Sequence, residues 1–525
     1  MHTPTWQIRN FRSLFILCII LLLSARAPGQ SDIQINTTPQ ALAESMINKP
    51  SFVENAKGEN FCWHARVGID QFLTNYELTG NTEWLDAGIQ YFDFLVSKMD
   101  TDPDGYKGWI GPYGYDKRYW QDSHVGDAIL ITALLDFSVL VLEDKDLKKK
   151  YAEKANSYVK LAARDFVEKY DKRGTWIEDG PYGSYVGFDK FLNPGDLSAW
   201  VHEPTVSRAG ISHPFNKQMD AGQVCLRLYR ITGNKIYRGR AERIFFTAKN
   251  HFQLHGNHYH WNYYEPLTPG DIDLEKKETN HWVSVHPFRS GYQAGEVSKI
   301  AEAYHYGIVF NEEDIKRIIN TNLEVMWNGD KENPEFINSN HLGPKDDTTG
   351  LAAFRRHYKT GNFAKNAGQL WTGLLDFDQR IRDLYEMRFK GDKNSPRYLH
   401  YKNTVLANPP GFRRKFVKGE VKVPEIKFSN SKELYMATVL PHQIEKNGQA
   451  ILVCKSNAPG ELRIDLYSKQ GEKLENLYSG DVAKNRTVAH TWNGKPSTGR
   501  KGYRGAYTIR WSIGDGYREF PVVVK

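Results

Sequence analysis

Before residue 390, apolar residues recur at three- and four-residue steps, the period of amphipathic helices. The segment Ala65–Met99 predicts two helices joined by a tight turn, Tyr76–Asn81. The Thr-Gly-Asn part of this turn returns in Tyr229–Asn234 and, in a shortened turn, in Tyr358–Asn362. The glycine favours the left-handed conformation that ends a helix, and Asn or Thr caps the next helix. The pattern therefore predicts repeated antiparallel helical hairpins.

Other helices follow the same period. They are a short helix at Pro39–Met46 and the pairs Val125–Glu143 with Asp146–Lys169, Gly291–Val309 with Glu312–Trp327, and Thr349–Tyr358 with Phe363–Phe389. About six such hairpins bury their shared faces by closing into a ring. Residues 31–400 therefore predict a mainly α fold, an incomplete or closed (α/α)6–7 toroid. Three long aromatic loops are expected to gather at one rim: Asp102–Asp122, Gly174–Ser212 and His255–Gly291.

The helical period ends near Asn408, and residues 401–445 predict a linker or bridge. From Gln449 onward, short alternating segments separated by Gly, Asn and Pro predict an antiparallel β-sandwich over residues 446–525. This segment resembles the Ig-like domain of flagellar hook-capping proteins, through Trp492–Gly494 and Gly505–Tyr507. The resemblance implies a structural or tethering module, so no chemistry is expected there.

Residues 1–30 predict an export signal. Arg9 and Arg12 precede the apolar run Leu14–Leu23, and small residues follow it. The run is short for a bilayer span, which favours cleavage over an uncleaved anchor. The sequence thus predicts an exported bacterial protein, periplasmic or extracellular, with no membrane association once the signal is removed.

Charge and cysteine content narrow the function further. A formal net charge of +8 is compatible with a polyanionic substrate, while the lack of a basic block or known motif disfavours nucleic acid. Cys62, Cys225 and Cys454 are scattered among apolar segments and are interpreted as buried small hydrophobes. No cofactor is expected, and partner proteins are not indicated.

Two clusters of histidines and aromatic rings carry the candidate chemistry, His255–Tyr292 and His202–Asn216. Such rings stack on pyranose faces, and cations meet sugar carboxylates. The alternative is aromatic-rich loop packing. The predicted substrate contacts are Trp120, His124, His258, His260, Trp261, Tyr264, Glu265, His281 and His286. Because the alternate histidines lack a clear third ligand, no metal is expected.

The hairpins, together with Asn257–Pro266 and His281–Val297, resemble toroidal polysaccharide lyases that act on uronate polymers. The most similar family is polysaccharide lyase family thirty-eight, whose members cleave glucuronan or alginate, and the resemblance covers roughly residues 50–390. It implies an exported lyase that cleaves a 1,4-linked uronate polysaccharide by β-elimination. The implied partner is an anionic polysaccharide.

β-Elimination needs a base at C5, an acid at the leaving oxygen and a group that neutralises the carboxylate. Tyr292 is the predicted proton carrier, with Arg289 as the cation that favours its phenolate; an Arg–Tyr stack is the alternative. His213 is the alternative base, and Asn216 is a carboxylate ligand or a helix cap. Glu203 is a neutraliser, a general acid or a loop salt-bridge partner.

Two other functions remain open from the sequence. An inverting glycoside hydrolase on the same toroid needs two carboxyl groups roughly 6.5–9.5 Å apart. Asp122, Glu203 and Glu265 are the available acids. The other is a non-catalytic glycan-binding protein, favoured if the His, Arg and Tyr side chains do not converge.

Overall fold

A computed structural model describes residues 35–49, 57–188, 190–204, 207–280, 286, 291–336, 368–389, 391–417, 420–497 and 503–525. The described helices are α2 Pro39–Ile47, α4 Gly58–Thr79, α5 Glu83–Ser97, α6 His124–Glu143, α7 Lys145–Ala162, α8 Lys169–Lys172, α9 Phe215–Thr232, α10 Lys235–Asn250, α11 Tyr292–His305, α12 Glu312–Asn320, α15 Gln379–Arg388 and α16 Pro396–Tyr401. The predicted export signal and the turn at Tyr358–Asn362 lie outside these residues.

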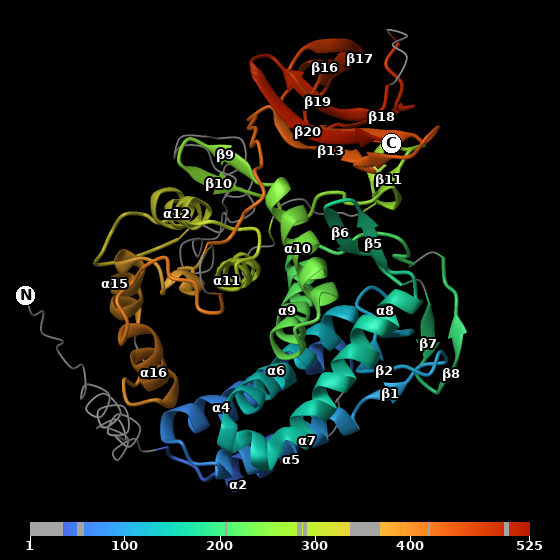
Figure 1. Ribbon diagram of the computed structural model, residues 1–525. Helices are drawn as coiled ribbons and strands as arrows, with labels where there is room; N and C mark the ends of the chain where they lie inside the picture. The colour runs from blue at the N-terminus through green and yellow to red at the C-terminus, as the bar shows by residue number, and fades with distance from the viewer. Residues whose placement is uncertain are drawn as a thin grey trace, which may run out of the picture.

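The hairpins α4–α5, α6–α7, α9–α10 and α11–α12 follow one another around an arc, with the C-terminal strands beyond α10 (Figure 1). The predicted fold class, a helical toroid followed by an antiparallel β-rich region, is confirmed. The predicted turns also form. Gly80 and Gly233 end α4 and α9 at φ of 66° and 70°, in the left-handed region. The Asn234 side chain then caps α10 by accepting from the Ile236 amide.

One predicted helix is shorter than expected. The interval Phe363–Phe389 was predicted as one helix, but in its described part α15 begins only at Gln379. A 3-10 turn, Thr372–Leu374, precedes it. The Asp378 side chain accepts a hydrogen bond from the Arg380 amide, so it caps a new helix rather than continuing an older one.

The helices bury two apolar cores, one among α4 to α7 and one among α9 to α12. The helix α6 is long and apolar enough by composition to cross a bilayer, but 83% of its apolar window is buried. It is therefore typical of a central core helix. Cys62, Cys225 and Cys454 are free and buried, as predicted.

Short strands lie in the three long loops or directly before them. They are β1 Asp100–Thr101, β2 Lys107–Gly108, β3 Ile110–Pro112, β4 Trp120–Asp122, β5 Trp176–Asp179, β6 Tyr182–Tyr185, β7 Phe191–Asn193, β8 Asp196–Val201, β9 Gln253–His255, β10 His258–His260, β11 Ile272–Asp273 and β12 Glu278–Thr279. The sheet β3-β4-β7-β8 joins the first two loops, and β4 leads directly into α6. A side chain at Gly111 would meet the backbone of Gly58, so this glycine lets β3 lie against the start of α4.

The C-terminal region is built from β13 Leu434–Leu440, β14 Gln443–Ile444, β15 Ala450–Ser456, β16 Gly460–Ser468, β17 Lys473–Val482, β18 Thr487–Trp492, β19 Gly505–Ile513 and β20 Gly516–Val524. The orders β13-β15-β18 and β14-β20-β19-β16-β17 give two sheets that share one apolar core. β13 lies in the segment predicted as a linker. Its residues are almost all buried, which hides the polar alternation that marks a strand.

The C-terminal β-rich region contacts the helical region at the strands β5 and β6. The Asp179 carboxylate accepts from the Gln443 amide at 2.9 Å and pairs with the His442 ring at 3.0 Å. Tyr182 stacks on the same imidazole with ring centroids 3.8 Å apart. The two regions thus share a polar and aromatic boundary.

Candidate functional site

A cavity of about 140 Å³ opens where α4, α6 and α9 begin. Its lining comes from the three helix starts, from α8 and from all three long loops: Glu59, Tyr113, Tyr115, Gln121, Asp122, Ser123, His124, Val125, Tyr170, Val186, Gly187, Phe188, Lys190, Arg208, Ile211, Ser212, His213, Pro214, Lys217 and Tyr263. The free amides at a helix start carry partial positive charge. Several of these helix ends face one cavity, so its field favours electron-rich ligands.

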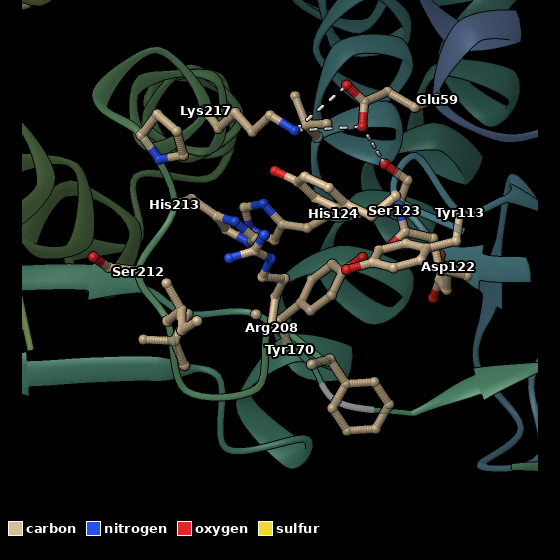
Figure 2. A pocket seen from close by; sticks show the side chains of 18 of the residues that line it. Glu59, Tyr113, Asp122, Ser123, His124, Tyr170, Arg208, Ser212, His213 and Lys217 are labelled. Carbon is tan, nitrogen blue, oxygen red and sulfur yellow. Dashed lines mark hydrogen bonds and ion pairs between the residues drawn. The ribbon is translucent and has the colours of Figure 1, made fainter. Parts of the chain in front are cut away.

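His124 and His213 form the centre of this pocket (Figure 2). Their rings stack with centroids 5.0 Å apart. His124 is 7% exposed, and within the described part of the chain neither ring nitrogen has a hydrogen-bond partner. Burial, and then the neighbouring charge of His213, hold the pKa of His124 well below its usual value of 6.5. His124 is therefore a neutral imidazole at neutral pH, with unused hydrogen-bonding capacity at the cavity wall.

Glu59 supplies a carboxyl group to the same pocket. Ser123, the N-cap of α6, donates to Glu59 Oε2 at 3.2 Å. Lys217 Nζ lies 3.4 Å from the same oxygen, and Trp63 Nε1 lies 3.4 Å from Oε1. The side chains of Glu59 and Lys217 are 32% and 28% exposed. This carboxyl group is thus oriented by three donors and still open to solvent.

Tyrosines and cations form the outer wall. Burial raises the pKa of Tyr113 to about 12, so its phenol keeps its proton. Tyr115 is 55% exposed, and the Arg208 guanidinium lies 4.6 Å from its ring centroid. Lys190 and Lys217 add positive charge at the rim. A flat ring beside cations suits a sugar that carries an anionic substituent.

A buried ionic network supports the wall behind His124. Lys169 Nζ bonds to Asp122 and Asp127 at 2.6 and 2.5 Å, and Arg173 bonds to Asp122 at 2.8 Å. Burial alone would raise the pKa of Asp122, but the two cations outweigh it and hold that pKa below its usual value. Ser123, and not Asp122, caps α6. The Asp122 carboxylate is committed to the network.

Two of the sequence-predicted residues meet in this pocket, His124 and His213. Two others, Asn216 and Tyr292, line a neighbouring cavity. Glu203 lines neither cavity and accepts from the Tyr119 hydroxyl at 3.3 Å. Arg289 and His281 lie outside the described residues. The predicted Arg289–Tyr292 pair therefore stays a prediction.

Most of the histidine-rich stretch packs internally instead of lining the pocket. Trp261 is 1% exposed and donates to Glu296 at 2.7 Å. His286, 1% exposed, lies 2.9 Å from the same carboxylate. Tyr264 is 2% exposed and Glu265 is fully buried. These side chains have no face open to a sugar, because they fill the core beneath the loops. The structure therefore does not place these four predicted substrate contacts at the pocket.

The remaining described contacts of the prediction lie on strands, and their side chains do not line the pocket. His260 pairs with His255 across β9 and β10, with nitrogens 2.9 Å apart, and His258 packs over the same strand pair. Trp120 lies in β4, with the Lys57 ammonium 5.8 Å from its ring. Within the described residues, no group of three or more His, Cys, Asp or Glu side chains has the geometry of a metal site.

Sequence reasoning missed Glu59, Ser123 and Lys217. Glu59 lies six residues before Ala65, where its helix was predicted to begin. Lys217 follows directly after the His202–Asn216 cluster, so a wider window would have included it. The sequence offered one signal for these residues. Each lies at or near the start of a long helix that adjoins an aromatic loop, where a polar side chain can face the rim.

No protein-family model and no curated protein sequence matches this chain. Among solved structures, an α-1,6-mannanase of glycoside hydrolase family 76 from Salegentibacter sp., in complex with α-1,6-mannotriose, is 16% identical. The match covers 53% of this chain and 69% of the mannanase chain, with a TM-score of 0.27. A family 76 glycoside hydrolase from a bovine Bacteroides thetaiotaomicron strain is 14% identical. The match covers 49% of this chain and 44% of that hydrolase, with a TM-score of 0.29.

The sequence predicted a polysaccharide lyase, whereas the solved structures named above are glycoside hydrolases. The matches described here support neither the resemblance to lyase family thirty-eight nor the resemblance to the hook-capping Ig-like domain. The coarser prediction, a glycan-degrading enzyme on a helical toroid, agrees with them.

Proposed function

We propose that the protein hydrolyses glycosidic bonds of a polysaccharide held at the His124–His213 pocket. The observation that carries the proposal is the buried, neutral His124, with no hydrogen-bond partner in the described chain, beside the oriented carboxyl group of Glu59. A neutral imidazole accepts a proton, and a carboxylic acid donates one. Together they supply the acid and the base that hydrolysis of an acetal requires.

In the proposed step, a water oxygen attacks the anomeric carbon while the bond from that carbon to the glycosidic oxygen breaks. His124 takes the proton that the water loses, and the leaving oxygen receives its proton from the carboxylic acid form of Glu59. The ammonium of Lys217 and the hydroxyl of Ser123 then stabilise the charge that develops on Glu59. One proton is given and one is taken, so the reaction balances.

The proposal includes an anionic substrate and an exported enzyme. Lys190, Arg208 and Lys217 surround the pocket, and a carboxylate or sulfate on the glycan would pair with them. Export rests on Arg9, Arg12 and the apolar run Leu14–Leu23. The mass of the secreted protein tests it, with a mature chain beginning near residue 31 as the expected result.

The test of hydrolysis uses alginate, glucuronan and α-1,6-mannan. The first two are anionic, and the third is the glycan class named for the similar mannanase. We expect new reducing ends without the ultraviolet absorbance of an unsaturated uronate. Glu59→Gln should lower the rate about 10²–10⁴-fold, the usual contribution of an acid–base group.

Glu203→Gln is the matched control, because Glu203 contacts Tyr119 and does not line the pocket. Its rate should equal that of the wild type. Absorbance that rises in step with the reducing ends would exclude hydrolysis, and full activity of Glu59→Gln would remove Glu59 from the mechanism.

A further inference from the structure

A second cavity, of about 310 Å³, lies beside the first. It is lined by Trp63, Arg66, Ile129, Asn216, Asp220, Gln223, Gly291, Tyr292, Gly295, Ser298 and Lys299. Most of these side chains come from α4, α9 and α11, so the cavity lies between those helices. Nothing in the chemistry proposed above uses it.

The two cavities share a wall. Trp63, which lines the second, lies within 3.4 Å of Glu59, which lines the first. Tyr263 of the first cavity stacks on Tyr292 of the second, with centroids 5.4 Å apart and planes inclined by 23°. Lys217 faces the first cavity and its neighbour Asn216 the second. A chain that leaves the first cavity therefore meets the second directly.

The second cavity contains buried acceptors that lack donors. Asn216 and Asp220 are 2% and 3% exposed. Within the described part of the chain, Asn216 Oδ1 and Asp220 Oδ2 have no hydrogen-bond partner. The other oxygen of Asp220 accepts from Lys299 at 2.6 Å. A buried acceptor left unpaired costs about 1–3 kcal/mol, so this site calls for a ligand with hydroxyl donors.

An aromatic platform completes the site. Trp63 is 41% exposed although it lies among large buried side chains of α4. An exposed indole beside two unpaired acceptors matches a pyranose ring, which offers an apolar face and several hydroxyl groups. Asn216, Asp220 and Gln223 present their side chains to it from successive turns of α9.

We propose that the second cavity is a sugar-binding subsite, which holds the residue of the glycan next to the one at the His124 pocket. This assignment rests on the proposed function for its choice of ligand. Trp63 stacks on the ring, while Asn216 Oδ1 and Asp220 Oδ2 accept from its hydroxyl groups. The subsite makes the enzyme act on chains of several sugars.

The test measures binding without requiring turnover. Tetrasaccharides of alginate, glucuronan and α-1,6-mannose are titrated calorimetrically into the wild type and into Trp63→Ala. At least one should bind the wild type, and Trp63→Ala should weaken it about tenfold, the size of a lost ring contact. Tyr517→Ala is the matched control, because Tyr517 is equally exposed, at 41%, but lies in β20.

A second variant tests the same cavity independently, in case Trp63→Ala does not fold. Gly295 lines the cavity, and a Cβ added there would have no heavy atom within 4 Å, so Gly295→Leu should place its side chain in the site. It should weaken the tetrasaccharide at least as much as Trp63→Ala while its disaccharide affinity changes less. Equal tetrasaccharide affinity in wild type, Trp63→Ala and Gly295→Leu would overturn the subsite, as would failure of all three sugars to bind the wild type. Binding without any hydrolysis would instead refute the proposed function alone.

Discussion

At the residue scale, the site depends on one imidazole kept neutral by its surroundings. His124 packs against Phe166, Tyr170 and Tyr185, with ring centroids 4.4 to 5.1 Å away. These rings exclude water, which disfavours the charged form. A histidine exposed to water would be partly protonated near its usual pKa of 6.5 and less available as a base.

We expect His124→Gln to lower kcat about 10²–10⁴-fold, because glutamine keeps a similar volume but cannot take a proton. His490→Ala, on the distant strand β18, serves as the control and should leave kcat unchanged. Turnover is measured as reducing ends released. An unchanged rate in His124→Gln would exclude it as the base.

The pH profile gives an independent check on the same residue. Since burial holds the pKa of His124 well below 6.5, the acid limb of kcat/KM should fall below pH 6.5. On acidification, the loss of rate caused by His124 gaining a proton should occur only at pH values well below 6.5. A limb at or above pH 6.5 would mean that a different group controls activity.

Part of the site could be predicted from the sequence. His124 and His213 each begin a segment in which a long loop meets a helix, so their position at the rim followed from the hairpin pattern. Trp261 and His286 looked equally suitable by residue type. Their burial depends on Glu296 of α11, a contact across the fold that spacing along the chain does not indicate.

At the element scale, the hairpins are set by their turns and caps. Gly80 and Gly233 have positive φ and open space around the missing side chain. Glycine is therefore needed at these positions for its left-handed backbone conformation, and not because a neighbouring segment packs closely against it. This local cause explains why the hairpins were predictable, whereas β13, buried on both faces, was not.

We expect Gly80→Ala and Gly233→Ala each to destabilise the protein by about 1 kcal/mol, because an alanine in the left-handed region carries a steric cost. Gly295→Ala is the matched control, since it lies within α11 in an ordinary helical conformation with open space. It should raise stability by up to about 1 kcal/mol. The measurement is the thermal unfolding midpoint, and equal effects of all three substitutions would contradict the argument.

At the scale of the whole molecule, the β-sheet region shares a buried polar boundary with the toroid. Glu265 is fully buried and accepts from Asn262 at 2.7 Å. Arg518 of β20 is 1% exposed, and its charge acts on Glu265. The segment predicted as a bridge thus leads into a region whose docking buries ionisable groups from both sides.

This boundary should make stability depend on pH. Burial raises the pKa of Glu265 to about 7, although Arg518 and the Asn262 bond act to lower it. Above pH 4.5 the unfolded chain releases this proton while the folded chain keeps it, so the contribution of Glu265 to stability falls until about pH 7. The loss is roughly 3 kcal/mol at most. Glu265→Gln cannot release a proton, so its stability relative to the wild type should increase between pH 4.5 and pH 8. Urea unfolding at both pH values measures this, and a constant difference between the two proteins would show that Glu265 does not titrate in this way.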